Sequence, residues 1–149
     1  MKILIDGDAC NVISCTEKIA KEKDIECHIF CDTSRILDSE YSQIHVVDKG
    51  FDSTDFAILN KCSNGDIIIT KDGGLAAMVL TKNAYAISPQ GFEYTRENIE
   101  IYLNRRYIRQ HEVKRTKRNQ VKGLINHEIE RIPFNKLLRS IISKSNKRK

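Results

Sequence analysis

The sequence predicts an α/β domain built on a mostly parallel sheet. Short apolar runs alternate with segments of helical spacing along residues 1–95, which is typical of a parallel sheet covered by helices on both faces. Apart from Lys2 and Thr70, residues 1–5 and 67–70 are apolar without polar alternation, as expected for strands that are buried on both sides. Acidic residues follow both runs closely, which places negative charge at one edge of the predicted sheet.

The expected strands and helices follow one another in a regular order. Strands are expected where β-branched and aromatic residues concentrate, at residues 1–5, 25–31, 44–47, 67–70 and 84–87. Helices are expected where apolar residues have helical spacing, at residues 12–23, 52–62 and 73–80. Thr95 is the expected N-cap of a helix that continues to about residue 109. Pro133 is expected to begin a short last helix that reaches Ile141.

The length and the charge distribution indicate one domain with a basic extension. A chain of 149 residues is the usual size of a single domain. We expect one domain over residues 1–143, with an α/β core at 1–95, a basic helical extension at 96–143 and a disordered tail at 144–149. The formal charge is −6 for residues 1–95 and +11 for the rest. This asymmetry indicates a polyanion partner, although a solvated helix face with a frayed terminus would give the same pattern.

Cysteine usage and the lack of long apolar runs favour a cytoplasmic protein with no membrane partner. The five cysteines are odd in number and contain no C-x-x-C pair, so buried thiols are expected rather than disulfides or a zinc site. The apolar stretch near the N-terminus is too short for a signal peptide. No run approaches the length that spans a bilayer.

Aspartates are placed where one crevice could collect them. Ligands of open α/β sheets bind beyond the carboxyl ends of the strands, and Asp6, Asp8 and Asp72 follow two predicted strands. Asp52 and Asp55 stand three apart at the start of a predicted helix and therefore share one of its faces. Clustered carboxylates repel one another and normally imply a cation. Oxygen ligands select Mg²⁺ or Mn²⁺ where phosphate oxygens complete the shell.

Each aspartate also has a structural explanation. Asp6 could cap the helix that follows it, and Asp52 could be an N-cap that interacts with the helix dipole. Asp72 could be an ordinary turn residue before two glycines, which would also let a phosphate approach the backbone. Asp55 is harder to explain in this way, because it lies one turn inside a helix beside Phe56, which we expect to be buried.

Other residues with reactive side chains are expected to be structural. Asp66 belongs to a Gly-Asp turn at the opposite end of its strand from Asp72. Cys10 is close to the acids, but the sequence places no histidine beside it, which favours a buried thiol over a nucleophile. No metal-ligand spacing is present among the histidines, which are His28, His45, His111 and His127.

Three segments carry a resemblance to a known family. They are DGDAC at residues 6–10, GFDSTDFAILNKCSNGDIIITKDGGLAA at 50–77 and SPQGFEYT at 88–95. In this order and combination the sequence resembles the YaiI/YqxD family of small bacterial proteins. The resemblance implies a compact, three-layer α/β fold similar to PIN and NYN domains, with an acidic, metal-binding centre.

The resemblance also implies which residues form that centre. The metal ligands would be Asp6, Asp8, Asp52, Asp55 and Asp72, and the hydroxyl of Thr70 would assist them. The sequence departs from the family pattern outside these acids. Asn11 stands where a proline is common, Ser88-Pro89-Gln90-Gly91 stands where N-P-R-G is frequent, and a Gly-Gly-Pro element after the long helix is replaced by a basic stretch. These departures concern how the substrate is held.

The first functional hypothesis is a metal-dependent phosphodiesterase that acts on RNA or single-stranded nucleic acid. Asp6, Asp8, Asp55 and Asp72 would hold one or two Mg²⁺ or Mn²⁺ ions, and one carboxylate would orient the attacking water. Basic side chains interleaved with tyrosines would bind the nucleic-acid backbone. These basic residues are Arg105, Arg106, Arg109, Lys114, Arg115, Lys117 and Arg118.

Two alternatives remain open at this point. The chain could be a nucleic-acid-binding module without turnover, whose affinity would fall steeply as salt rises. It could also be a small-molecule phosphatase or nucleotide-handling enzyme, although the sequence contains neither a Walker-type loop nor a G-x-G-x-x-G signature. A homo-oligomer is compatible with all three hypotheses.

Overall fold

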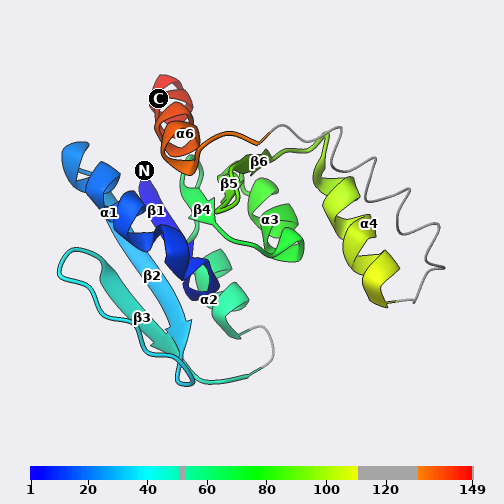
Figure 1. The fold of residues 1–149 in the computed structure, drawn as a ribbon, viewed down its shortest axis with the longest axis horizontal. Helices are drawn as coiled ribbons and strands as arrows, with labels where there is room; N and C mark the ends of the chain where they lie inside the picture. The colour runs from blue at the N-terminus through cyan, green and yellow to red at the C-terminus, as the bar shows by residue number, and fades with distance from the viewer. Residues whose placement is uncertain (51–52, 111–130, 149) are drawn as a thin grey trace.

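The protein was analysed as a computed structural model that describes residues 1–50, 53–110 and 131–148. Within these residues one six-stranded sheet has the order β3-β2-β1-β4-β5-β6 (Figure 1). Every pair of neighbouring strands is parallel except β5 and β6. The strands are β1 (Lys2–Asp6), β2 (Glu26–Asp32), β3 (Gln43–Val47), β4 (Ile67–Ile69), β5 (Tyr85–Ser88) and β6 (Phe92–Tyr94). The α/β class and the mostly parallel sheet predicted from the sequence are confirmed.

The order of the strands creates one reversal point next to β1. From β1 the chain moves outward to β2 and β3, and it then returns to place β4 on the other side of β1. Ile3 of β1 therefore pairs with Cys27 on one side and with Ile67 on the other. Ligands of open α/β sheets bind outside the carboxyl ends of the strands at such a reversal. In this chain that location lies beyond Asp6 and Ile69.

Helices cover both faces of the sheet, which gives three layers. Side chains of α1 and α6 pack with Ile3 and Ile5 on one face, whereas α2 and α3 pack with Leu4 on the other. Alternate residues of β1 thus point to opposite faces, as strand geometry requires. This arrangement is consistent with the expected PIN-like architecture. The helices are the 3₁₀ helix η1 (Gly7–Val12), α1 (Ile13–Glu22), α2 (Ser53–Lys61), α3 (Gly73–Leu80), α4 (Ile99–Gln110) and α6 (Phe134–Lys147).

The C-terminal helix α6 forms part of the core and continues beyond the end that we expected. Its apolar residues Leu138, Ile141 and Ile142 are at most 1% exposed. The hydroxyl of Ser145 donates a hydrogen bond of 2.6 Å to the carbonyl of Gly65, which anchors the last turns. The expectation of disorder from residue 144 is therefore wrong up to Lys147, because this tertiary contact holds the helix end in place.

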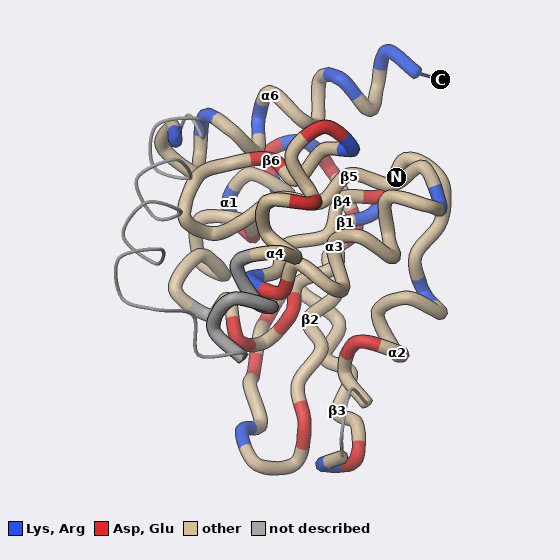
Figure 2. The backbone as a smooth tube through the Cα atoms, turned by 90° about the vertical axis from the view of Figure 1, so that its right-hand side faces the viewer, with Lys and Arg blue, Asp and Glu red and all other residues tan. Residues whose placement is uncertain are grey.

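Basic residues recur along α6 (Figure 2), and two of them form ion pairs with the α/β core. A nitrogen of Arg139 lies 2.8 Å from a carboxylate oxygen of Glu22, and Lys144 lies 3.0 Å from Glu93. The positive charge of this helix is thus partly balanced by acids of the body. Exposed ion pairs of this kind contribute little to the free energy of unfolding, so the attachment of α6 depends mainly on its buried apolar side chains.

The strand β6 was not predicted. The turn expected at residues 89–91 leads into a short antiparallel strand that pairs with β5. Gly91 makes this turn possible, because its φ is +100° and a Cβ atom there would lie only 2.0 Å from the carbonyl oxygen of Ile132. The Ile132 amide also donates to the Gly91 carbonyl at 2.8 Å. Three residues with one polar position between two aromatics gave too short a pattern to be recognised as a strand.

Three of the four thiols that the structure describes are buried as expected, and the side chain of Cys10 lies outside the described part. Cys27, Cys31 and Cys62 are buried and free, and Cys15 is free and half-buried. Burial raises the pKa of Cys27 and of Cys62 to about 11, so both stay protonated and unreactive near neutral pH. In residues 1–50, 53–110 and 131–148, no helix is both long enough and apolar enough to cross a membrane.

Candidate functional site

An open pocket lies at the reversal point of the sheet. Its volume is about 350 Å³, and it receives side chains from the end of β1, from η1, from α2 and from the start of α3. All four aspartates that we predicted as catalytic line it. The full lining is Asp6, Asp8, Gly50, Ser53, Thr54, Asp55, Lys71 and Asp72. The fold thus brings together carboxylates from positions that are up to 66 residues apart in the sequence.

Asp6 and Thr70 tie the ends of the two central strands together. Asp6 is 6% exposed, and its carboxylate accepts hydrogen bonds from the Thr70 hydroxyl at 3.0 Å and from the Asp8 amide at 3.3 Å. The oxygen of the Thr70 hydroxyl in turn accepts from the Asp72 amide at 3.0 Å. The supporting position predicted for Thr70 therefore corresponds to a direct contact with Asp6 and with the backbone of Asp72.

The electrostatics of Asp6 are those of a buried acid beside other acids. Burial raises the pKa of Asp6 above its ordinary value, and the negative charges of Asp8 and Asp72 raise it further. The hydrogen bonds from the Asp8 amide and the Thr70 hydroxyl act in the opposite direction, but they do not reverse the shift. Both donors are uncharged. A cation in the pocket would relieve this accumulation of negative charge.

Asp72 has a structural role in addition to its place in the pocket. It is the N-cap of α3, and its carboxylate accepts a hydrogen bond of 2.8 Å from the Gly74 amide. Gly73 serves the packing of helices, because a Cβ atom there would lie 3.2 Å from the Cβ of Tyr102 in α4. Gly73 is therefore explained by this close contact between α3 and α4, without a phosphate.

Asp8 and Asp55 add two further carboxylates to the pocket. Asp8 is exposed, and Asp55 is half-buried in the first turn of α2. The expectation that Phe56 is buried is wrong, since this residue is 57% exposed. The reason is the helical period: Ile58, which is fully buried against the sheet, lies about 200° further around the helix than Phe56.

The acids share a pocket without forming a complete metal cage. Among residues 1–50, 53–110 and 131–148, no three His, Cys, Asp or Glu side chains are arranged so that they could hold a metal ion. Asp52, which we predicted as a ligand, lies outside the described residues, as do His111 and His127. The donor set fits a hard cation held by one or two carboxylates, with water or phosphate oxygens completing the shell, which is how Mg²⁺ is usually bound.

Sequence reasoning missed Lys71 and a histidine pair. Lys71 is exposed and lines the acidic pocket, and its position between Thr70 and Asp72 was the available signal. His28 is fully buried, and its Nδ1 lies 2.8 Å from Nε2 of His45. No sequence pattern indicated this pair, because the two residues are brought together only by the register of β2 and β3.

The predicted nucleic-acid-binding residues fall where the structure gives no side-chain information. Arg105, Arg106 and Arg109 belong to α4, but their side chains are outside the described part. The other basic residues predicted for this role lie wholly outside the described ranges, and they are Lys114, Arg115, Lys117 and Arg118. Their role stays a prediction.

The fold and the site together define a three-layer α/β domain with an acidic pocket at the reversal point of its sheet. The model of the family described as "Uncharacterized BCR, YaiI/YqxD family" matches residues 4–144. The chain therefore belongs to the YaiI/YqxD family, as the sequence resemblance indicated.

Curated relatives support this membership over most of the chain. A UPF0178 protein of Clostridium kluyveri is 53% identical over 108 residues, which cover 72% of this chain and 71% of the relative. One from Clostridium acetobutylicum is 43% identical over 123 residues, 83% of each chain. One from Lachnoclostridium phytofermentans is 45% identical over 119 residues, 80% of each chain. No solved structure gives a significant match.

Proposed function

We propose that this protein is a divalent-metal-dependent phosphodiesterase that acts on RNA or single-stranded nucleic acid. One observation carries the proposal: Asp6, Asp8, Asp55 and Asp72 line a single open pocket at the reversal point of a parallel sheet. Acids concentrated at a ligand-binding position of this fold type, where burial and like charges raise the pKa of one of them, are typical of functional sites rather than of ordinary surfaces.

The four acids of the pocket would have different roles. A bound Mg²⁺ or Mn²⁺ would supply an activated water and stabilise the charge that develops on the phosphodiester. Asp6 and Asp72, which Thr70 holds in fixed relation, would be the anchoring ligands. Asp8 and Asp55 would complete the site and orient the attacking water.

Lys71 gives the pocket one positive side chain at its rim. In this position it would bind a substrate phosphate and bring its oxygens to the acids, where they would complete the coordination shell. This assignment explains why the acids form no complete cage by themselves: Mg²⁺ sites that act on phosphates commonly use one or two carboxylates together with the substrate.

The test is cleavage of end-labelled single-stranded RNA with Mn²⁺, and with EDTA as the metal-free control. We expect Asp72→Asn and Asp6→Asn to lower the cleavage rate by about 100-fold or more. Asp24→Asn is the matched control, because Asp24 is exposed outside the pocket and its positive φ of 55° suits asparagine. Equal cleavage by the wild type and Asp72→Asn would identify a contaminating nuclease and end the proposal.

A second candidate is a nucleic-acid-binding module without turnover. It is favoured by the finding that no three metal-ligating side chains come together within the described ranges. This candidate predicts RNA binding in EDTA that weakens steeply with salt and is unchanged in Asp72→Asn. Binding that requires Mn²⁺ and is lost in Asp72→Asn would exclude it.

A further inference from the structure

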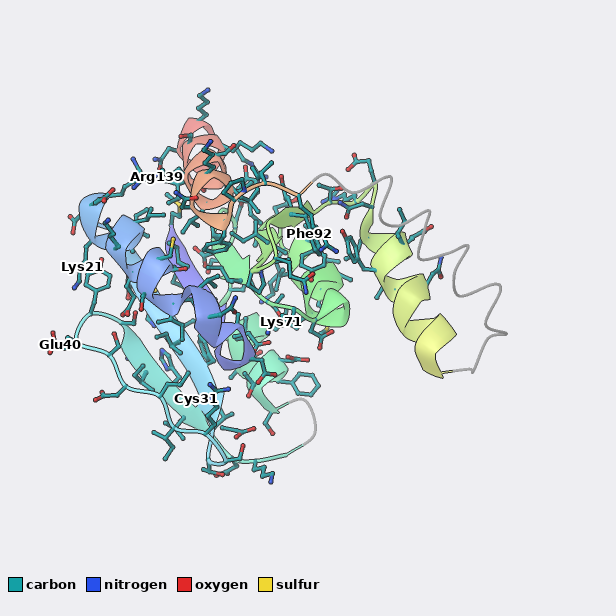
Figure 3. All side chains as sticks on the ribbon, in the orientation of Figure 1. Lys21, Cys31, Glu40, Lys71, Phe92 and Arg139 are labelled. Atoms are coloured by element: carbon teal, nitrogen blue, oxygen red, sulfur yellow. The ribbon has the colours of Figure 1, made fainter. Side chains whose placement is uncertain are left out.

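A second pocket of about 480 Å³ adjoins the acidic pocket. The two pockets share Lys71 and Asp72, which follow β4. The second pocket extends from these residues toward the β5–β6 hairpin and the first half of α4. Figure 3 labels Lys71 and Phe92, which belong to its lining and lie on the same flank of the molecule, near α3. A ligand that reaches from one pocket into the other would pass Lys71.

Aromatic rings form one wall of this second pocket. The rings of Phe92 and Tyr102 are stacked, with their centroids 4.7 Å apart and their planes within 6°. Tyr94 meets both rings edge-on, with centroid distances of 5.1 Å to Phe92 and 5.0 Å to Tyr102. Leu103, which is 37% exposed, extends the apolar surface along α4. Phe92 and Tyr94 are only 6% and 2% exposed, so the wall reaches the pocket mainly through the half-buried Tyr102 and through Leu103. The buried rings behind it keep this wall rigid.

Polar groups also line the same pocket. Ser88 is buried at the end of β5, and its hydroxyl oxygen accepts a hydrogen bond of 3.1 Å from the Gln90 amide. The side chain of Gln90 is exposed at the turn of the hairpin and can both donate and accept. A ligand on the aromatic wall would therefore have polar side chains within the same pocket for its edges.

The aromatic wall is connected to the acidic site by a hydrogen bond. The Tyr94 hydroxyl donates to the carbonyl oxygen of Thr70 at 3.3 Å, and the Thr70 hydroxyl contacts Asp6. Burial raises the pKa of Tyr94 to about 12, so the donor keeps its proton near neutral pH. The relative placement of the two pockets is thus fixed by buried contacts.

We infer that the second pocket binds an unpaired nucleobase of the substrate, next to the phosphate that is held at the acidic pocket. A flat ring with polar edges matches an aromatic wall with hydrogen-bonding side chains beside it, and the volume is within the range of small-molecule sites. A nucleobase inside a duplex cannot enter such a pocket without being flipped out. The inference rests on the proposed function for the phosphate at the acidic pocket, and it narrows the substrate to single-stranded nucleic acid.

The experiment measures binding of adenosine to the full-length protein in EDTA, by saturation-transfer NMR and by titration of amide shifts. Ribose is the comparison ligand, because it lacks the base. We expect adenosine to bind in the millimolar range or tighter and ribose not to bind. Since no metal is present and adenosine carries no phosphate, this result is independent of cleavage.

Variants at the wall locate the bound base. We expect Leu103→Glu to weaken adenosine binding about tenfold, because it replaces part of the apolar wall by a charge. Val46→Glu is the matched control, since Val46 is 46% exposed on β3 and outside the second pocket. Tyr102→Leu should weaken binding to a similar degree, whereas Tyr102→Phe, which keeps the ring, should bind as the wild type does.

The outcomes separate this inference from the proposed function. Adenosine binding that Leu103→Glu removes and Val46→Glu preserves supports the base pocket, whether or not RNA is cleaved. Absence of adenosine binding to the wild type, equal binding of ribose, or unchanged binding by Leu103→Glu would overturn the base pocket even if cleavage depends on Asp72. If Tyr102→Leu is unfolded by circular dichroism, the Leu103 and ribose comparisons still decide.

Discussion

The two ends of the central strands β1 and β4 carry the same residue type in opposite electrostatic situations. At the amino end, Asp66 is 2% exposed, and it accepts hydrogen bonds from the backbone amides of Lys2 and Ser63 and from the Lys2 ammonium, at 3.0, 2.8 and 2.5 Å. At the carboxyl end, Asp6 accepts from two uncharged donors and has further acids as neighbours. A buried carboxylate with a cation partner is in a favourable environment, whereas a buried carboxylate with other acids as neighbours is typical of a functional site.

The largest expected effect comes from exchanging these two aspartates for asparagine. Asp6→Asn should remove cleavage, and it should leave the free energy of unfolding unchanged or raised in EDTA, because a crowded negative charge disappears. Asp66→Asn should lower the free energy of unfolding by about 1–3 kcal/mol and leave the cleavage rate per folded molecule unchanged. Urea denaturation and RNA cleavage of both variants check this. Equal destabilisation of the two variants would refute the contrast between the two ends.

Two turn glycines, Gly65 before β4 and Gly91 after β5, allow the two ends of the sheet to be compared by their backbone constraints. Gly91→Ala should destabilise the protein by about 2–4 kcal/mol, because a positive φ is combined with a contact of 2.0 Å to the Ile132 carbonyl. Gly65, before Asp66, has a φ of +85°, but a Cβ atom there would lie 3.5 Å from the Ser145 hydroxyl, which is an ordinary contact. Gly65→Ala should therefore cost only about 1–2 kcal/mol. Thermal unfolding of both variants gives the difference, and an equal loss would contradict the close approach at Gly91.

Substitutions of Thr70 test whether the acids at the carboxyl ends of β1 and β4 must be held in position for cleavage. Thr70→Val keeps the shape of the side chain but removes the hydrogen bonds to Asp6 and to the Asp72 amide. We expect the cleavage rate to fall by about 10-fold to 100-fold and Thr70→Ser to restore most of it. The rate constant at saturating RNA should change more than KM. If Thr70→Ser loses as much of the rate as Thr70→Val, the hydroxyl by itself does not position the acids, which would contradict this prediction.

The smallest expected effect is on the pH dependence of stability, and it concerns the pair formed by His28 of β2 and His45 of β3. Burial lowers the pKa of His45 below its ordinary value, and the charges of His28 and Lys61 lower it further. A histidine whose pKa is lowered by folding contributes stability that is complete above its unfolded pKa of about 6.5 and declines as the pH falls below that value.

We therefore expect the melting temperature of the wild type to fall between pH 7.5 and pH 5.5 by more than that of His45→Gln. The glutamine amide can donate to or accept from His28 Nδ1, so the variant removes the titrating group while it retains a hydrogen-bonding partner for His28. Differential scanning calorimetry at the two pH values measures the difference. An identical fall in both proteins would show that other groups cause the acid sensitivity.

The sequence by itself determined the central strands and the position of the acids. Uninterrupted apolar runs predicted β1 and β4, and acids that follow parallel strands must emerge at the same edge of the sheet. The grouping of Asp6, Asp8 and Asp72 in one pocket follows from this rule, and so does the separation of Asp66, which precedes its strand. These predictions succeeded because they depend on local pattern and on strand direction alone.

Only the tertiary structure decided the features that depend on contacts between distant segments. The strand β6 depends on its pairing with β5, the close contact at Gly91 depends on Ile132, and the helical end of α6 depends on the Gly65 carbonyl. The aromatic wall brings Phe92 and Tyr94 of one strand against Tyr102 of α4. Local propensity carries no information on such partners, because the free energy that holds these side chains comes from burial against segments remote in sequence.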